Sequence, residues 1–162
     1  MDSMIRIYEL RSELELRLAN ALFILSKNSK NIKKELILED NDTFFSAVIT
    51  HAYFAIFYAA KALLLTKGIK TEAPEVHKKT LNAFETEFVK NGELDVALLN
   101  IYKEMMVRAD ELLGIFKAEK KKRGRFTYRI IAEANVPFAE ESLRRAGKFV
   151  RNIFQVLRKT GG

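Results

Sequence analysis

The sequence predicts an all-α protein, a bundle of four to five antiparallel helices that forms a single domain over residues 1–162. Hydrophobic residues recur at spacings of three and four along most of the chain. Only two prolines and seven glycines interrupt the 162 residues. With 48% hydrophobic and 30% charged residues, the composition is that of a folded globular protein. The length suits one domain with a sizeable core.

The first helix is predicted from an apolar stripe that begins at Ile7 and resumes at Ile32 and Leu36. The stripe consists of Ile7, Leu10, Leu14, Leu18, Ala21 and Leu25. This spacing is typical of an amphipathic helix. Residues 26–31, "SKNSKN", form either a bend or a continuous solvated turn. "EDNDT" at 39–43 then predicts a stop, with Asp42 as the N-cap of the next helix.

The second helix, at about 43–67, contains the apolar run "HAYFAIFYAAKALLLTKG", residues 51–68. The run is long enough for a membrane span. However, Lys61 and His51 would be costly near the centre of a bilayer, and no second span shelters them. A soluble central helix is therefore favoured, and no membrane association is expected. Its small residues, which would let another helix approach closely, are Ala52, Ala55, Ala59 and Ala62; Gly68 ends the helix.

Three further helices are predicted after Gly68. Pro74 is expected in the first turn of the third helix, whose buried face is His77, Leu81, Phe84 and Phe88, and "NG" at 91–92 ends it. A fourth helix from about residue 93 carries Leu94, Leu98, Ile101, Met105, Ala109, Leu112 and Phe116. Pro137 opens the last helix, with Ala139, Leu143, Ala146, Val150, Ile153 and Leu157 inside and Arg144, Lys148, Arg151 and Arg158 outside.

Several kinds of chemistry are disfavoured by the composition. The chain has no cysteine, which excludes disulfides, thiolate zinc sites and cysteine nucleophiles. His51 and His77 lie on different predicted helices and neither has a second ligand nearby, so no metal site is expected. No glycine-rich phosphate loop is present, and no cofactor is expected. The N-terminus lacks the apolar core of a secretory signal, so a cytoplasmic location is expected.

A basic cluster between the last two helices is the best candidate for a binding site. The formal net charge is +7 and the pI is about 9.6, which favours an anionic partner. Two aromatic residues, Phe126 and Tyr128, lie within the cluster. Its cations, which would contact RNA or nucleotide phosphates, are Lys120, Lys121, Lys122, Arg123, Arg125 and Arg129. The alternative is a solvated loop whose aromatic rings turn into the core.

Two segments resemble the HEPN family (higher eukaryotes and prokaryotes nucleotide-binding). "HAYFAIFYAAKALLLTKGI" at 51–69 is similar to that family's central helix, and "HKKTLNAFETEFVKNGELD" at 77–95 is similar to the segment that follows. The resemblance covers roughly residues 40–155 and leaves an extended N-terminal helix. It implies a helical bundle, often dimeric.

The resemblance also implies a function. Many HEPN domains are toxins of toxin–antitoxin pairs and act as metal-independent ribonucleases through an Arg, four to six residues, then His. Here Arg123 is followed after four residues by Tyr128, with no His nearby, so a branch lacking the usual motif is indicated and enzyme activity stays open. Tyr is a poor base at neutral pH. Arg123 and Tyr128 are the candidate catalytic residues.

The resemblance implies partners as well. They are a second copy in a homodimer and a minimal nucleotidyltransferase antitoxin, which in this family can modify a Tyr near the motif, here Tyr128. Two other hypotheses stand beside the toxin–antitoxin interpretation. One is a non-catalytic module whose small-residue helix faces and basic last helix dock a partner or another copy. The other is a membrane-associated helical protein, which rests only on the apolar run.

Overall fold

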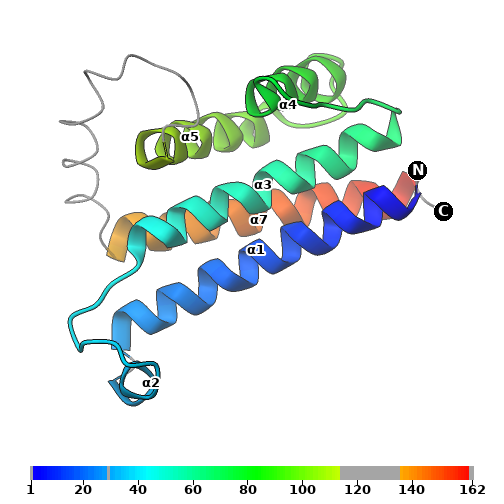
Figure 1. Ribbon diagram of the computed structural model, residues 1–162. Helices are drawn as coiled ribbons and strands as arrows, with labels where there is room; N and C mark the ends of the chain where they lie inside the picture. Colours follow the sequence, from blue (N-terminus) through cyan, green and yellow to red (C-terminus); the bar gives the residue numbers. More distant parts are fainter. Residues whose placement is uncertain (1, 29, 114–135, 161–162) are drawn as a thin grey trace.

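The computed structural model describes residues 2–28, 30–113 and 136–160, and these are built from helices without a strand (Figure 1). The all-α class is therefore confirmed. The elements are α1 (Asp2–Asn28), α2 (Lys30–Glu35), α3 (Phe45–Thr66), α4 (Val76–Phe84), the π-helical turn η1 (Glu85–Val89), α5 (Val96–Leu113) and α7 (Val136–Thr160). The arrangement is compatible with the expected bundle of four to five helices.

Helix α3 lies at the centre, in contact with α1, α4, α5 and α7 (Figure 1). It is the one described helix that is long and apolar enough to cross a membrane, and 78% of its most apolar stretch is buried inside the protein. The four predicted small residues, Ala52, Ala55, Ala59 and Ala62, have no exposed surface. A helix covered on every side by other helices needs no lipid to shelter its apolar residues.

Helix α1 packs closely on α3 through small side chains. The buried Ser12 hydroxyl donates a hydrogen bond to the Ala55 carbonyl at 2.7 Å, and Ala19 is fully buried in the same contact face. A backbone carbonyl can be reached in this way only where neither helix carries a large side chain at the crossing. The small-residue face of α3 is therefore used within the chain itself.

The predicted apolar stripe of α1 faces solvent rather than the core. Ile7, Leu10, Leu14 and Leu18 retain 40 to 59% of their surface exposed. The core side of α1 is instead made by Ile5, Tyr8, Ser12, Leu16, Ala19, Leu22 and Phe23. The prediction of a helix is confirmed, but that of its inward face is wrong, because α3 selects the side of α1 that has small residues at the crossing point.

The start of α3 also differs from the prediction. Asp42 is not the N-cap: its carboxylate accepts a hydrogen bond from the Glu39 backbone at 2.9 Å and so closes the preceding turn. The cap position is Phe44, which has no side-chain cap; its backbone N–H donates to the Ser26 hydroxyl of α1 at 2.7 Å. At the other end Gly68 adopts φ of +72°, which confirms it as the C-terminal stop.

Helices α4 and α5 begin later than predicted, and their buried faces agree with the expectation. Pro74 lies two residues before α4 and not in its first turn. Leu81, Phe84 and Phe88 are buried.

Helix α5 begins at Val96 because the Asp95 carboxylate accepts a hydrogen bond from the Ala97 N–H at 2.8 Å. Leu94 precedes the helix, Leu98, Ile101, Met105 and Ala109 are buried, and Phe116 lies outside the described residues.

Helix α7 matches the prediction on both faces. It begins at Val136 with Pro137 in its first turn. Ala139, Ala146, Val150, Ile153 and Leu157 are buried, and Leu143 is half-buried. The four basic residues of the opposite face, Arg144, Lys148, Arg151 and Arg158, are exposed. A helix with one apolar and one strongly charged face has a single way to lie on a core.

Candidate functional site

The predicted basic cluster lies outside the described residues. Its members Lys120, Lys121, Lys122, Arg123, Arg125, Tyr128 and Arg129 all belong to the segment 114–135, between α5 and α7. The assignment of RNA binding and catalysis to these residues stays a prediction. The candidate site is therefore built from residues on the described helices.

A histidine and a tyrosine form a polar pair between α4 and α3. The Tyr53 hydroxyl lies 2.8 Å from Nδ1 of His77. Tyr53 is fully buried and His77 is half-buried. The imidazole ring also packs on Phe57, with ring centroids 4.4 Å apart, and on Phe54 at 6.1 Å. The surroundings of His77 are thus mostly apolar, with one polar contact at Nδ1.

These surroundings influence the protonation of both His77 and Tyr53. Burial lowers the pKa of His77 below its ordinary value of 6.5, and the positive charge of Lys61 lowers it further. Burial raises the pKa of Tyr53, and the negative charge of Asp110 on α5 adds to the effect. The phenol therefore keeps its proton. In the tautomer that carries the ring proton on Nε2, the phenol donates a hydrogen bond to Nδ1 of His77. A neutral imidazole can accept or donate a proton, so His77 is a candidate general acid–base residue.

The pairing of these two residues was not predicted from the sequence, although a signal was present. Tyr53 belongs to the segment 51–69 and His77 to the segment 77–95, the two segments that carry the family resemblance. His51, the other histidine, has a different environment: its Nδ1 lies 2.6 Å from the Glu15 carboxylate of α1. Among the described residues no group of three or more His, Asp or Glu side chains could hold a metal ion.

An ion-pair network fixes α5 against α7. The Arg108 guanidinium donates to the Ser142 hydroxyl and to the Glu141 carboxylate, both at 3.1 Å. Arg145 contacts the other oxygen of Glu141 at 2.8 Å and also pairs with Glu104 on α5. Since both arginines are largely shielded from solvent, their charges are neutralised in place.

A groove of about 250 Å³ lies between the same two helices and is lined by cations. Asn100 and Glu104 of α5 form one wall, and Arg144, Arg145 and Lys148 of α7 form the other. Arg145 is neutralised by Glu104 and Glu141. Arg144 and Lys148 are exposed and have no carboxylate partner in the described part of the chain. The groove therefore offers these two positive charges to an anion.

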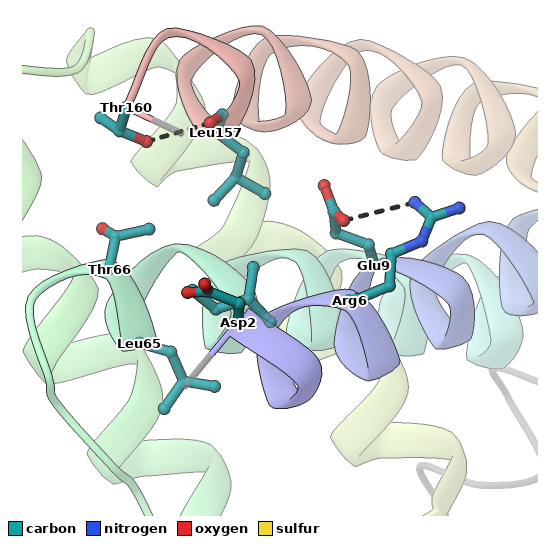
Figure 2. Close-up of a pocket in the computed structure, with 8 residues that line it drawn as sticks. Asp2, Arg6, Glu9, Leu65, Thr66, Leu157 and Thr160 are labelled. Carbon is teal, nitrogen blue, oxygen red and sulfur yellow. Dashed lines mark hydrogen bonds and ion pairs between the residues drawn. The ribbon is translucent and has the colours of Figure 1, made fainter. Parts of the chain in front are cut away.

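A larger cleft of about 440 Å³ lies where α1 begins and α3 and α7 end (Figure 2). Asp2, Arg6 and Glu9 of α1 face Leu65 and Thr66 of α3 and Leu157 and Thr160 of α7 across it. The Arg6 guanidinium forms an ion pair with the Glu9 carboxylate, with an N–O distance of 3.4 Å. Neither His77 nor the cationic face of α7 lines this cleft, and its charged groups oppose one another, so it is a weaker candidate for an anion.

Two known proteins with similar sequences are named as candidate toxins. No protein-family model matches the chain. It is 35% identical over 100 residues to a candidate toxin of Methanocaldococcus jannaschii, which covers 62% of both chains. A second candidate toxin of the same organism is 38% identical over 66 residues, 41% of this chain and 46% of the relative.

The third relative is a UPF0332 protein of Thermotoga maritima, 39% identical over 69 residues, 43% of this chain and 49% of the relative. The chain thus spans about half to three-fifths of the length of these relatives. The names indicate a toxin-like family and a toxin-like function for the group that this chain resembles.

Proposed function

We propose that the protein is a HEPN-type component of a toxin–antitoxin-like pair and that it binds RNA or a nucleotide through residues 120–129 together with the cationic face of α7. The similarity to two candidate toxins supports the toxin-like part. The observation that carries the binding part is the groove between α5 and α7, where Arg144 and Lys148 have no carboxylate partner among the described residues.

The distribution of charge along the chain supports this location. Residues 1–113 contain 15 Lys or Arg and 17 Asp or Glu, a slight negative balance. Residues 114–162 contain 13 Lys or Arg and only 4 Asp or Glu. All of the excess positive charge thus lies in the basic segment and in α7. Such a local excess attracts phosphates far more than the same charge spread evenly would.

The two basic elements are adjacent in the chain and suit one ligand. Arg144 and Lys148 lie in the third and fourth turns of α7, soon after the segment that holds Arg123 and Arg125 in the sequence. Phosphate oxygens would contact these cations, and bases would stack on Phe126 and Tyr128. No phosphate loop is needed, because side chains alone provide the charge.

Ribonuclease activity is an extension of this proposal. Arg123 would stabilise the phosphate, and Tyr128 is the second candidate catalytic residue that the resemblance implies. The described residues add His77, whose lowered pKa keeps the imidazole neutral at neutral pH, so that the ring can act as a proton acceptor. A minimal nucleotidyltransferase that binds this chain and modifies Tyr128 belongs to the same proposal, as does action in the cytoplasm.

Binding is tested by RNA retardation in native gels at several salt concentrations. Arg144→Ala combined with Lys148→Ala, and separately Arg123→Ala, are expected to weaken binding by about tenfold or more. Each is also expected to make the salt dependence shallower, by about one released ion for each phosphate that is no longer neutralised. Lys90→Ala is the matched control, since Lys90 lies outside the basic region. Equal affinity and salt dependence in all four proteins would rule out the assigned site.

Cleavage is tested on the same RNA, end-labelled and without added metal. If the wild-type protein cleaves and both Arg123→Ala and His77→Ala abolish cleavage, the extension to ribonuclease is supported. Cleavage that survives both substitutions would remove these residues from the mechanism. Retardation without cleavage would leave a binding protein that acts through its partner.

A further inference from the structure

We propose that a pocket between the start of α1 and the end of α3 binds a small organic molecule with one carboxylate and an apolar body. The pocket has a volume of about 200 Å³ and lies where α1 begins beside the last turns of α3 (Figure 1). It shares only Leu65 with the cleft shown in Figure 2, and it shares no residue with the groove between α5 and α7. This site is therefore separate from the proposed RNA-binding surface.

Lys61 is the cation that the carboxylate would contact. It is the only Lys, Arg, Asp or Glu residue in α3, and it is half-buried. Its Nζ donates a hydrogen bond to the Thr71 carbonyl at 3.0 Å and lies 4.8 Å from the centre of the Tyr8 ring. Because Tyr8 and Thr71 both line the pocket, the ammonium group lies at the pocket wall.

This ammonium group lacks a counter-ion in the described part of the chain. Its contacts are the Thr71 carbonyl and the faces of the Tyr8 and Phe57 rings, with no carboxylate among them. A lysine has three N–H donors, and only one of those on Lys61 has an oxygen partner among the described residues. Removing an ammonium group from water is costly, and aromatic rings offset only part of that cost. An anion in the pocket would supply the opposite charge and accept a further hydrogen bond.

The charge and size of the pocket favour a small monoanion. Lys70 and Glu72 also line it, so together with Lys61 the lining carries two cations and one carboxylate, a net charge of +1. A single carboxylate would neutralise this charge. A phosphate monoester carries about −1.5 to −2 at neutral pH and would be repelled by Glu72. Pockets for drug-sized ligands measure about 300–1,000 Å³, so this one suits a molecule smaller than a nucleotide.

Apolar side chains form the rest of the wall and would hold the body of the ligand. Leu65 is buried, Tyr8 and Ile69 are half-buried, and Met4 is 41% exposed. With its carboxylate at Lys61, the ligand would place its apolar part against these residues. Removal of both apolar surfaces from water favours binding. An inorganic anion would leave this part of the wall without a partner.

Contacts between neighbouring elements hold the pocket in shape. The Tyr8 ring stacks on Tyr58 of α3, with ring centroids 6.0 Å apart. The Thr80 hydroxyl donates its single proton to the Val76 carbonyl, so it accepts a hydrogen bond from the Thr71 hydroxyl at 2.7 Å. Thr71 is thus fixed through both its hydroxyl and its carbonyl. A pocket that is already formed needs little ordering when a ligand binds.

Benzoate tests the pocket, and benzyl alcohol, which has the same ring without the charge, is the control ligand. Amide signals of Ile69, Lys70 and Glu72 in ¹H–¹⁵N NMR spectra are expected to shift with benzoate. The expected Kd is about 1 mM or lower, an affinity within reach of so small a ligand. Benzyl alcohol is expected to bind at least about tenfold more weakly, because it makes no charged hydrogen bond. Inorganic phosphate at matched ionic strength is expected to leave these signals in place.

Three results of these titrations would overturn the proposal. The first is that benzoate leaves the signals unmoved at about 10 mM, tenfold above the expected Kd. The second is that benzyl alcohol binds as tightly as benzoate, which would mean that Lys61 plays no part. The third is that phosphate binds more tightly than benzoate, which would make the pocket a site for inorganic anions.

Variants then test the residues. Lys61→Met keeps the length of the side chain and removes its charge, so the Kd for benzoate is expected to rise by about tenfold or more. Lys78→Met is the matched control, because Lys78 is exposed on α4 and does not line the pocket. A folded Lys61→Met protein that binds benzoate as tightly as the wild type would overturn the proposal.

A second variant fills the pocket and leaves Lys61 in place. Met4 is partly exposed on α1, so Met4→Trp should preserve the helix content measured by circular dichroism. The larger side chain is expected to abolish benzoate binding by occupying the apolar part of the pocket. This variant decides the question if Lys61→Met does not fold, and unchanged benzoate affinity in Met4→Trp would then overturn the proposal.

Discussion

The Tyr53 hydroxyl and Nδ1 of His77 lie 2.8 Å apart and join α3 to α4 through one hydrogen bond in a mostly aromatic environment. A phenol that donates to Nδ1 stabilises the neutral form of His77. The pair links the two segments that resemble the HEPN family, and it can be tested separately from any function.

Tyr53→Phe is expected to raise the pKa of His77 toward 6.5, since the donor that favours the neutral ring is removed. The free energy of unfolding should fall by about 0.5–1.5 kcal/mol. The titration of the His77 ring protons by NMR measures the first effect, and urea unfolding measures the second. His51, which contacts Glu15 instead, serves as the internal reference, and an unshifted His77 would contradict the expected donor role.

The pH dependence of stability should carry a contribution from His77. Its pKa in the folded protein lies below the ordinary 6.5, so the unfolded chain binds a proton more readily as the pH falls through that value. Stability from the neutral ring is therefore complete above about pH 6.5 and is lost as the pH falls toward the folded pKa. Urea unfolding measures the free energy of unfolding near pH 7.5 and near pH 5.5. The decrease between the two pH values should be smaller for His77→Gln than for the wild type. An equal loss would exclude this contribution.

Tyr102→Phe is expected to leave stability unchanged or to raise it by about 1 kcal/mol. The Tyr102 hydroxyl is buried and has no hydrogen-bond partner among the described residues. Burial raises the pKa of this phenol, so it remains neutral. Removing a hydroxyl that is desolvated without compensation relieves a cost and preserves the shape of the ring. Thermal unfolding checks the result, and a loss above about 1 kcal/mol would mean that the hydroxyl has a partner such as a buried water.

Ala59→Leu is expected to destabilise the fold by about 1–3 kcal/mol or more, because Ala59 is fully buried on the central helix. Leu14→Ala, which removes a large side chain from the outer face of α1, should change the free energy of unfolding of a single chain by less than about 0.5 kcal/mol. Denaturant unfolding at low protein concentration compares the two. Similar losses would mean that the outer face of α1 packs in the folded monomer.

The helices that the sequence predicted well have apolar residues on one side only. The inner and outer faces of α7 and the buried Leu81, Phe84 and Phe88 follow directly from their spacing. Helix α1 has apolar residues on two opposite sides, Ile5 and Leu16 on one and Leu10 and Leu14 on the other, so periodicity alone could not identify the inward face. The crossing with α3 decided it.

The candidate site was less predictable for the same kind of reason. Tyr53 and His77 are 24 residues apart on different helices, and only the tertiary fold brings them together. Asp42 is a residue type that often caps helices, but its carboxylate is used by the turn at Glu39. The cationic face of α7 was predicted from spacing. Only the structure shows that Arg145 pairs with Glu104 and Glu141. Arg144 and Lys148 are left without a carboxylate partner among the described residues.

The central position of α3 has a consequence for synthesis on the ribosome. The helix ends at Thr66, and the last residue of α7 that helps to cover it is made about 90 residues later. At about 5–20 residues per second, α3 spends roughly 5–20 seconds with only α1 and the helices made so far available to shield its apolar surface. The nascent chain therefore passes through a stage in which its most apolar segment is a substrate for chaperones, and release from that stage depends on the translation of α7.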